Sequence, residues 1–66
     1  MSVVIRRRPS VRLEINDDDS IVAAVDVDES GDVTISTDPE ISREAAKALA
    51  AAIVQACEEY EREVRP

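Results

Sequence analysis

The chain has 66 residues, no His, one Cys, one aromatic residue and a formal net charge of -7. This length fits a single domain, and the absence of His excludes imidazole-ligated metal and the Ser-His-Asp and Cys-His catalytic arrangements. One Cys excludes an intrachain disulfide, and the sequence has neither an apolar run of about 18 residues nor a signal-peptide pattern. We therefore expect a cytoplasmic, non-enzymatic protein without a cofactor and without membrane association.

Charge is distributed unevenly along the chain. Residues 1–13 carry four Arg and no acid, residues 14–42 carry ten acids and no base, and residues 43–66 carry four bases and five acids. Pro9 follows the run of Arg at 6–8, which indicates a basic lead-in or an edge strand over residues 1–9.

Three segments show the alternation of a strand with one buried face. In the first, Val11, Leu13 and Ile15 alternate with polar residues. The second is residues 21–27 and the third is residues 33–37, and together they predict an antiparallel β-meander. The inward residues expected in these two strands are Ile21, Ala23, Val25, Val27, Val33 and Ile35.

The connections suggest how the strands pair. If Val27 faces Val33, the loop is residues 29–31, with Gly31 at the position where a three-residue hairpin needs a left-handed residue. If the inward residues of the first two strands also face each other, the loop of the first hairpin is residues 16–20. This register pairs Ile15 with Ile21, Leu13 with Ala23 and Val11 with Val25, and it places Arg8 across from Asp28 and Arg12 diagonal to Asp26.

The remaining residues, 39–65, predict one helix. Two starts fit the sequence: Asp38 as N-cap before Pro39, or Ser42 as N-cap with Ile41 packing onto Ala46. Ser42 is the favoured start of the regular helix, with a short turn before it. At about 100° per residue, one face is apolar and the opposite face is charged. The apolar face holds Ala45, Ala46, Leu49, Ala52, Ile53, Ala56, Cys57, Tyr60 and Val64, and the charged face holds Lys47, Glu58, Glu61, Arg62 and Arg65.

These elements predict an α+β fold, in which a three-stranded antiparallel β-meander packs against one long C-terminal α-helix within a single domain, residues 1–66. The helix would run about 35 Å and extend past its sheet, leaving Tyr60 and Val64 in need of a partner. A domain this small, without Phe or Trp, buries little surface, so we expect a homodimer. The expected interface residues are Ala52, Ile53, Ala56, Cys57, Tyr60 and Val64.

Residues 26–33 resemble the start of an EF-hand calcium loop, with possible oxygen ligands at alternate positions followed by an apolar residue. The candidate ligands are Asp26, Asp28, Ser30 and Asp32, but position twelve is Thr37 in place of a bidentate Glu. The alternative interpretation is a plain β-turn that needs Gly31 for its backbone.

Other charged clusters allow further hypotheses. Asp17, Asp18 and Asp19 fit a solvated hairpin tip better than a cation site. The Arg run could contact phosphate, but without aromatic stacking residues and with ten acids downstream the sequence does not favour nucleic-acid binding. The acidic surface could instead mimic nucleic acid and occupy the basic cleft of a DNA- or RNA-binding protein.

Strands ending in Asp-Val-Thr-Ile-Ser, followed by Ser-Arg-Glu-Ala-Ala-Lys-Ala-Leu-Ala-Ala-Ala-Ile, resemble small uncharacterised proteins of actinobacteria and their phages. The resemblance covers roughly residues 20–57 and implies an origin but no functional residue. The function expected from the sequence is a homodimeric protein-interaction module with a further, unidentified protein partner, and a phage-encoded modulator of a host protein is one form of that function. A nucleic-acid mimic and a calcium-binding module are the alternatives.

Overall fold

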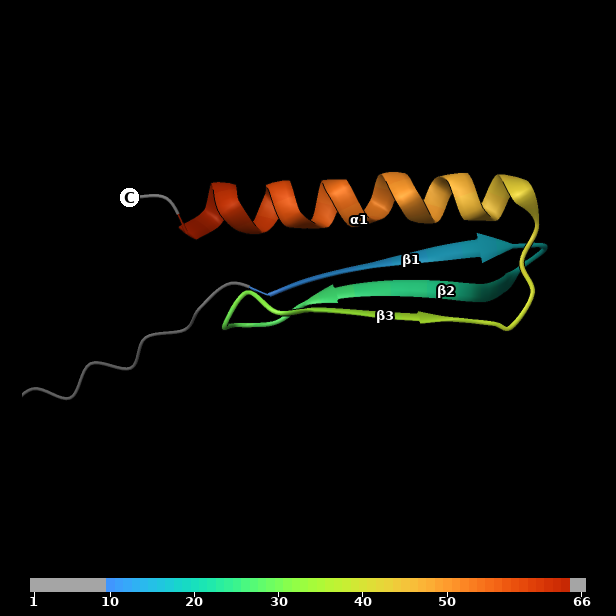
Figure 1. Cartoon of the computed structure of the whole chain (residues 1–66), viewed down its shortest axis with the longest axis horizontal. Coiled ribbons are helices and arrows are strands. Elements are labelled where there is room, and N and C mark those ends of the chain that lie inside the picture. Colours follow the sequence, from blue (N-terminus) through green and yellow to red (C-terminus); the bar gives the residue numbers. More distant parts are fainter. Residues whose placement is uncertain (1–9, 65–66) are drawn as a thin grey trace, which may run out of the picture.

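A computed structural model describes residues 10–64. The elements are β1 (Val11–Asp17), β2 (Ser20–Val27), β3 (Val33–Thr37) and α1 (Arg43–Val64). The strands form one antiparallel sheet in the order β1-β2-β3, with α1 along one face (Figure 1). The predicted α+β fold is therefore confirmed. The expected lead-in over residues 1–9, with Arg8 across from Asp28, lies outside the described residues.

The hairpin between β2 and β3 has the predicted register. Val27 pairs with Val33 and Val25 with Ile35. Gly31 has a φ of 92°, which supplies the left-handed residue that the short loop requires. The loop closes through hydrogen bonds in which the N–H of Asp28 donates to the carbonyl of Asp32 and the N–H of Gly31 donates to the carbonyl of Asp28.

The predicted register of the first hairpin is wrong. Ile15 pairs with Ala23, Leu13 with Val25 and Val11 with Val27, so β2 is displaced by two residues from the expected pairing. The turn accounts for one residue of this displacement, because Asp18 and Asp19 both adopt left-handed conformations, with φ of 50° and 66°, and the extra residue of β2 beside the turn accounts for the other. Two consecutive left-handed residues make a tight two-residue turn, where the sequence had suggested a five-residue loop.

An irregularity beside this turn changes which side chains of β2 face inward. The register shifts between Ile15 and Asn16, where Asn16 pairs with Ile21 and leaves Val22 as the extra residue. Such a bulge reverses the side-chain alternation on one side of it. Ile21 is therefore exposed, contrary to the prediction, while Val22 packs against the core.

The first turn of α1 is capped by Ser42, as predicted. Its Oγ accepts a hydrogen bond from the N–H of Ala45 at 3.1 Å and donates one to Oδ2 of Asp17 at 3.0 Å. The first bond satisfies a backbone donor that has no partner within the helix. The second bond ties the start of the helix to the end of β1.

The core is built from small side chains. Ala45, Ala52 and Ala56 are the buried residues of α1, and the largest fully buried side chains are those of Val25 and Val27. Ala permits the helix backbone to approach the sheet closely. The helix lies over β1 and β2, and β3 extends beyond its cover.

Tyr60 finds its partner within the chain, which corrects the expectation that it needs a second molecule. Its hydroxyl donates a hydrogen bond to the carbonyl of Glu29 at 3.1 Å, and its ring lies beside Gly31. The hairpin between β2 and β3 thus extends the sheet beneath the C-terminal half of α1 (Figure 1).

Candidate interaction surface

The most unusual surface of the described chain is the inner face of β3. Val33 and Ile35 lie in register with Val27 and Val25, whose side chains are 2% and 0% exposed. Directly opposed residues of an antiparallel pair share a face, so Val33 and Ile35 point to the helix side of the sheet. They are nevertheless 42% and 47% exposed. They face inward as predicted, but they are not buried, because α1 covers only the other two strands.

One flank of α1 borders this face. Ile53, Cys57 and Tyr60 recur at helical spacing and share one side of the helix. Since Tyr60 contacts the hairpin that leads into β3, this side of α1 is turned toward β3. Ile53 and Cys57 are half-buried there. We call Val33, Ile35, Ile53 and Cys57 the β3 surface.

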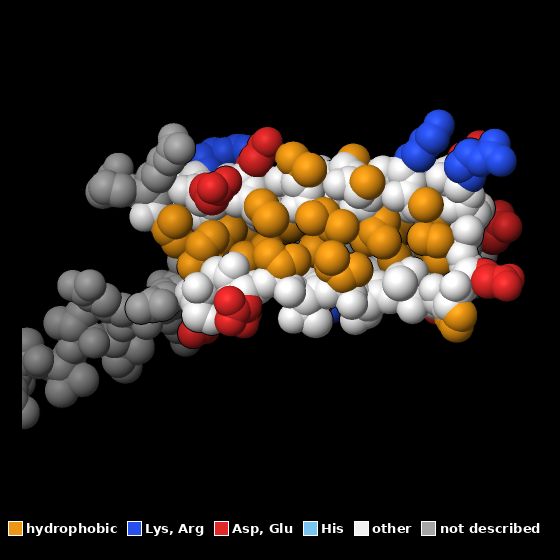
Figure 2. Space-filling model, viewed as in Figure 1, with side chains coloured by type: hydrophobic (Ala, Val, Ile, Leu, Met, Phe, Trp, Pro, Cys, Tyr) orange, Lys and Arg blue, Asp and Glu red, His pale blue; other side chains and the backbone are white. Residues whose placement is uncertain are grey.

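A space-filling view shows the continuity of this region. Hydrophobic side chains form a band along the molecule between α1 and the outer part of the sheet (Figure 2). Charged side chains lie above and below the band and at the ends of the molecule (Figure 2). Contiguous apolar surface bordered by charge is typical of an interaction site, whereas scattered apolar residues are ordinary.

The backbone of β3 also has an open edge. The N–H of Asp38 donates to the carbonyl of Val22, and the carbonyl of Asp32 accepts from the N–H of Asp28. The even-numbered residues from 32 to 38 therefore direct their backbone N–H and C=O groups toward β2. Because the direction alternates along an antiparallel strand, the N–H and C=O groups of Val33, Ile35 and Thr37 point away from the sheet.

The two edges of the sheet differ in protection. β3 reads Val-Thr-Ile-Ser-Thr and has no charged residue and no Pro. β1, at the other edge, carries Arg12 and Glu14. Charged residues commonly protect sheet edges from pairing with other strands, so the β3 edge is the one suited to accept a further strand.

The end of β3 next to the hairpin is acidic. Asp28 accepts hydrogen bonds at one oxygen, Oδ1, from the N–H and hydroxyl of Ser30 and from the N–H of Asp32. These bonds, with that of the Ser30 hydroxyl the largest contributor, lower the pKa of the Asp28 carboxyl. The exposed carboxylates of Glu29 and Asp32 lie in the same loop.

The structure separates the candidate calcium ligands. Asp26 lies on the sheet face away from α1, where its Oδ2 is 2.7 Å from Nη1 of Arg12. That bond to Asp26, together with its charge, raises the pKa of Arg12. Asp28 turns its carboxylate into its own loop, toward Ser30 and Asp32. Within residues 10–64, no group of three or more acidic or Cys side chains is placed to hold a metal ion.

Arg12 and Asp26 also differ from the predicted placement. They are directly opposite each other, where the sequence had suggested a diagonal pair. The two-residue displacement of β2 accounts for the change. Arg12 makes a second, longer contact with Glu14 at 3.3 Å.

The predicted interface residues fall into four groups. Ala52 and Ala56 face the sheet and are buried within the fold, so they are not available to a partner. Ile53 and Cys57 belong to the β3 surface, and Tyr60 is held by the hairpin. Val64 is exposed near the end of α1.

Sequence reasoning missed Val33 and Ile35 as surface residues, although a geometric signal was present. A helix with its side chains is about 10 Å across, and strands are spaced about 4.8 Å apart. One helix therefore covers about two strands, so one of the two edge strands of the predicted meander had to extend beyond it.

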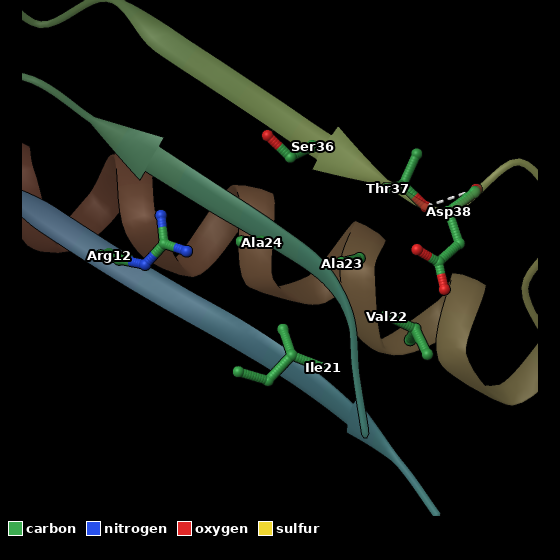
Figure 3. Close-up of a pocket in the computed structure, with 8 residues that line it drawn as sticks. All are labelled: Arg12, Ile21, Val22, Ala23, Ala24, Ser36, Thr37 and Asp38. Atoms are coloured by element: carbon green, nitrogen blue, oxygen red, sulfur yellow. Dashed lines mark hydrogen bonds between the residues drawn. The ribbon is translucent and has the colours of Figure 1, made fainter. Parts of the chain in front are cut away.

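A shallow hollow lies on the opposite face of the sheet. It has a volume of about 220 Å³. Arg12, Ala24 and Ser36 line it from three adjacent strands, with α1 behind them in this view (Figure 3). Ligand pockets commonly have volumes of about 300 to 1,000 Å³, and Arg12 is already paired with Asp26. The hollow is therefore a weaker candidate for a binding site than the β3 surface is.

Comparisons with known proteins give no match: no family model, no curated protein and no solved structure is significantly similar to this chain. In the part of the chain that the structure describes, no helix has both the length and the apolar character needed to cross a membrane.

Proposed function

We propose that this protein is a non-enzymatic interaction module that forms a homodimer through the β3 surface. The observation that supports this proposal is the exposure of Val33 and Ile35, at 42% and 47%, beside paired residues that are fully buried. An apolar sheet face of this kind is stabilised when a second element covers it.

The small core gives an energetic reason for dimerisation. No residue larger than Val is fully buried in the described chain. Removing the exposed part of Val33 and Ile35 from water contributes roughly 1 kcal/mol for each side chain, in each copy. That gain is a substantial addition for a domain whose total stability is of the order of a few kcal/mol.

Sedimentation equilibrium of the full chain at tens of micromolar tests the proposal. We expect the wild type to have the mass of a dimer and the variant Ile35→Glu to be a monomer, because the new carboxylate would be desolvated at the interface. Ser36→Glu is the matched control, since it adds the same charge to the same strand on the opposite face. A monomeric wild type, or equal effects of the two variants, would contradict this interface.

A further inference from the structure

We propose that the open edge of β3 binds residues 1–6 of a second copy, which add to the sheet as an antiparallel fourth strand. This inference rests on the proposed homodimer and identifies the segment that forms it. Addition of an extended segment to an exposed sheet edge is a common mode of peptide recognition. The segment, the register and the source of the strand follow from separate observations.

The backbone of β3 requires an extended partner. Val33, Ile35 and Thr37 direct their N–H and C=O groups away from β2, and their side chains lie on the same face as the buried residues of that strand. A strand that pairs with these three residues therefore places every second side chain over the helix side of the sheet.

The first six residues have the matching pattern. Met1, Val3 and Ile5 are apolar, and the residues between and after them are Ser2, Val4 and Arg6, of which Val4 is also apolar. Val and Ile are favoured in strands, and a period of two places Met1, Val3 and Ile5 on one face. That face would extend the β3 surface.

Charge determines the register. When Ile5 is opposite Val33 and Val3 is opposite Ile35, the counting along antiparallel strands places Arg6 opposite Asp32. The next two Arg then continue toward the acidic hairpin that contains Asp28 and Glu29. Moving the segment two residues further along β3 would instead place Arg7 opposite Val33, on the apolar face. The first register is therefore favoured.

Chain length favours a second copy as the source. β1 begins at the hairpin end of the sheet, where Val11 pairs with Val27 and Val27 with Val33 (Figure 1). A strand beside β3 lies three spacings from β1, or about 14 Å, and the five steps from Arg6 to Val11 span at most about 17 Å. The difference is too small for a path around the hairpin and the Tyr60 ring that lies against it. A second copy provides the segment without this detour.

Binding of residues 1–6 of each copy to β3 of the other also reduces electrostatic repulsion between the copies. Two chains with a net charge of -7 repel each other as whole molecules. Placing the Arg run of each copy beside Asp28, Glu29 and Asp32 of the other brings opposite charges together at both junctions.

Hydrogen exchange of the ¹⁵N-labelled full chain tests whether the edge is occupied. We expect the amides of Val33, Ile35 and Thr37 to exchange at least about tenfold more slowly in the wild type than in a chain lacking residues 2–8, because a paired amide must open before it exchanges. In a mixture of labelled and unlabelled chains, isotope-filtered NOEs should connect methyl groups of Ile5 and Val33 in different copies.

A charge exchange tests the register. Asp32→Arg and Arg6→Asp should each weaken dimerisation roughly fivefold, and the double variant should restore it, as expected for a cross-strand ion pair. The side chain of Asp32 is exposed and only its backbone makes hydrogen bonds in the hairpin, so the fold tolerates the change. Arg62→Asp, on the charged face of α1, is the control for net charge and should leave the dimer unchanged.

The outcomes separate this inference from the proposed function. A dimer whose Val33, Ile35 and Thr37 amides exchange freely would overturn the strand addition and leave the homodimer intact. A monomeric wild type would overturn both proposals. Protected amides with NOEs only within one copy would overturn the second copy as the source, and a double variant as weak as the single ones would overturn the register.

Discussion

A single carboxylate oxygen organises the hairpin between β2 and β3. Asp28 Oδ1 accepts hydrogen bonds of 2.9 Å from the Ser30 N–H, 2.7 Å from the Ser30 hydroxyl and 3.0 Å from the Asp32 N–H. An ionised carboxylate accepts such bonds more strongly than a neutral one does. The charged form of Asp28 is therefore linked to the folded loop.

This linkage predicts a pH dependence. The pKa of Asp28 is lower in the folded chain than its ordinary value of 3.8, so its contribution to stability is present above that value and is lost as the pH falls through the folded pKa. Urea unfolding of the wild type and Asp28→Ala should show a difference in unfolding free energy at pH 6 that shrinks below pH 3.8. A constant difference across this range would contradict the role given to the charge.

Gly31 is the second residue with a specific role in this loop. Its φ of 92° is strained for any residue with a Cβ, and a Cβ there would lie 3.4 Å from the Tyr60 ring. We expect Gly31→Ala to lower the unfolding free energy by about 1 to 2 kcal/mol, measured by urea unfolding. Glu29→Ala is the control, because only the backbone carbonyl of Glu29 is used by Tyr60. Equal losses in the two variants would argue against backbone strain.

These two loops show what the sequence could predict at this scale. The loop between β2 and β3 was predictable from Gly31, because a lone Gly between two alternating segments leaves one position for the left-handed residue. The turn between β1 and β2 was not predictable from Asp18 and Asp19. Asp tolerates the left-handed region without requiring it, and three consecutive Asp residues fit several loop lengths equally well.

At the scale of elements, the start of α1 is connected to the sheet through Ser42. Its hydroxyl oxygen accepts from Ala45 while its hydrogen is directed to Asp17. One side chain therefore both ends the loop after β3 and fixes the helix against the end of β1.

Removing this hydroxyl tests the cap. Ser42→Ala should lower the unfolding free energy by about 1 kcal/mol, because it leaves the Ala45 N–H without its side-chain acceptor. Ser42→Thr retains the hydroxyl and should recover most of the loss. Thermal unfolding followed by circular dichroism at 222 nm measures both. A Thr variant as unstable as the Ala variant would show that the hydroxyl is not responsible.

The helix was predictable because its signals agree, whereas its position over the sheet was not. Ser42, the Ala-rich stretch and the apolar spacing all indicate one helix, and its inward residues Ala45, Ala52 and Ala56 were correctly assigned to its apolar face. Periodicity specifies which side of a helix is buried, but it carries no information on which strands lie beneath that side. The exposure of Val33 and Ile35 depends on that missing information.

The whole molecule combines a thin core with an uncovered strand. Most buried side chains are Ala or Val, and the strand that the helix leaves open is also the strand with an uncharged edge. In the proposed dimer, the contact at β3 both adds buried apolar surface to the small core and covers the strand that α1 leaves open.

The proposed dimer predicts that stability depends on concentration. Because association favours the folded form by mass action, the melting temperature should rise as protein concentration increases from a few micromolar to a few hundred. Ile35→Glu should melt at a lower temperature that does not change with concentration. Differential scanning calorimetry measures both, and a wild-type melting temperature independent of concentration would contradict the homodimer.

The position of Tyr60 makes tyrosine fluorescence a probe of one specific contact in this fold. Tyr60 is the only aromatic residue of the sequence, and its hydroxyl bonds to Glu29, on the hairpin between β2 and β3. All intrinsic fluorescence therefore originates at one contact between the end of α1 and the sheet. Emission from the unmodified protein reports the docking of helix on hairpin separately from the helix content that circular dichroism records, so the two signals together show whether this contact breaks before the helix unfolds.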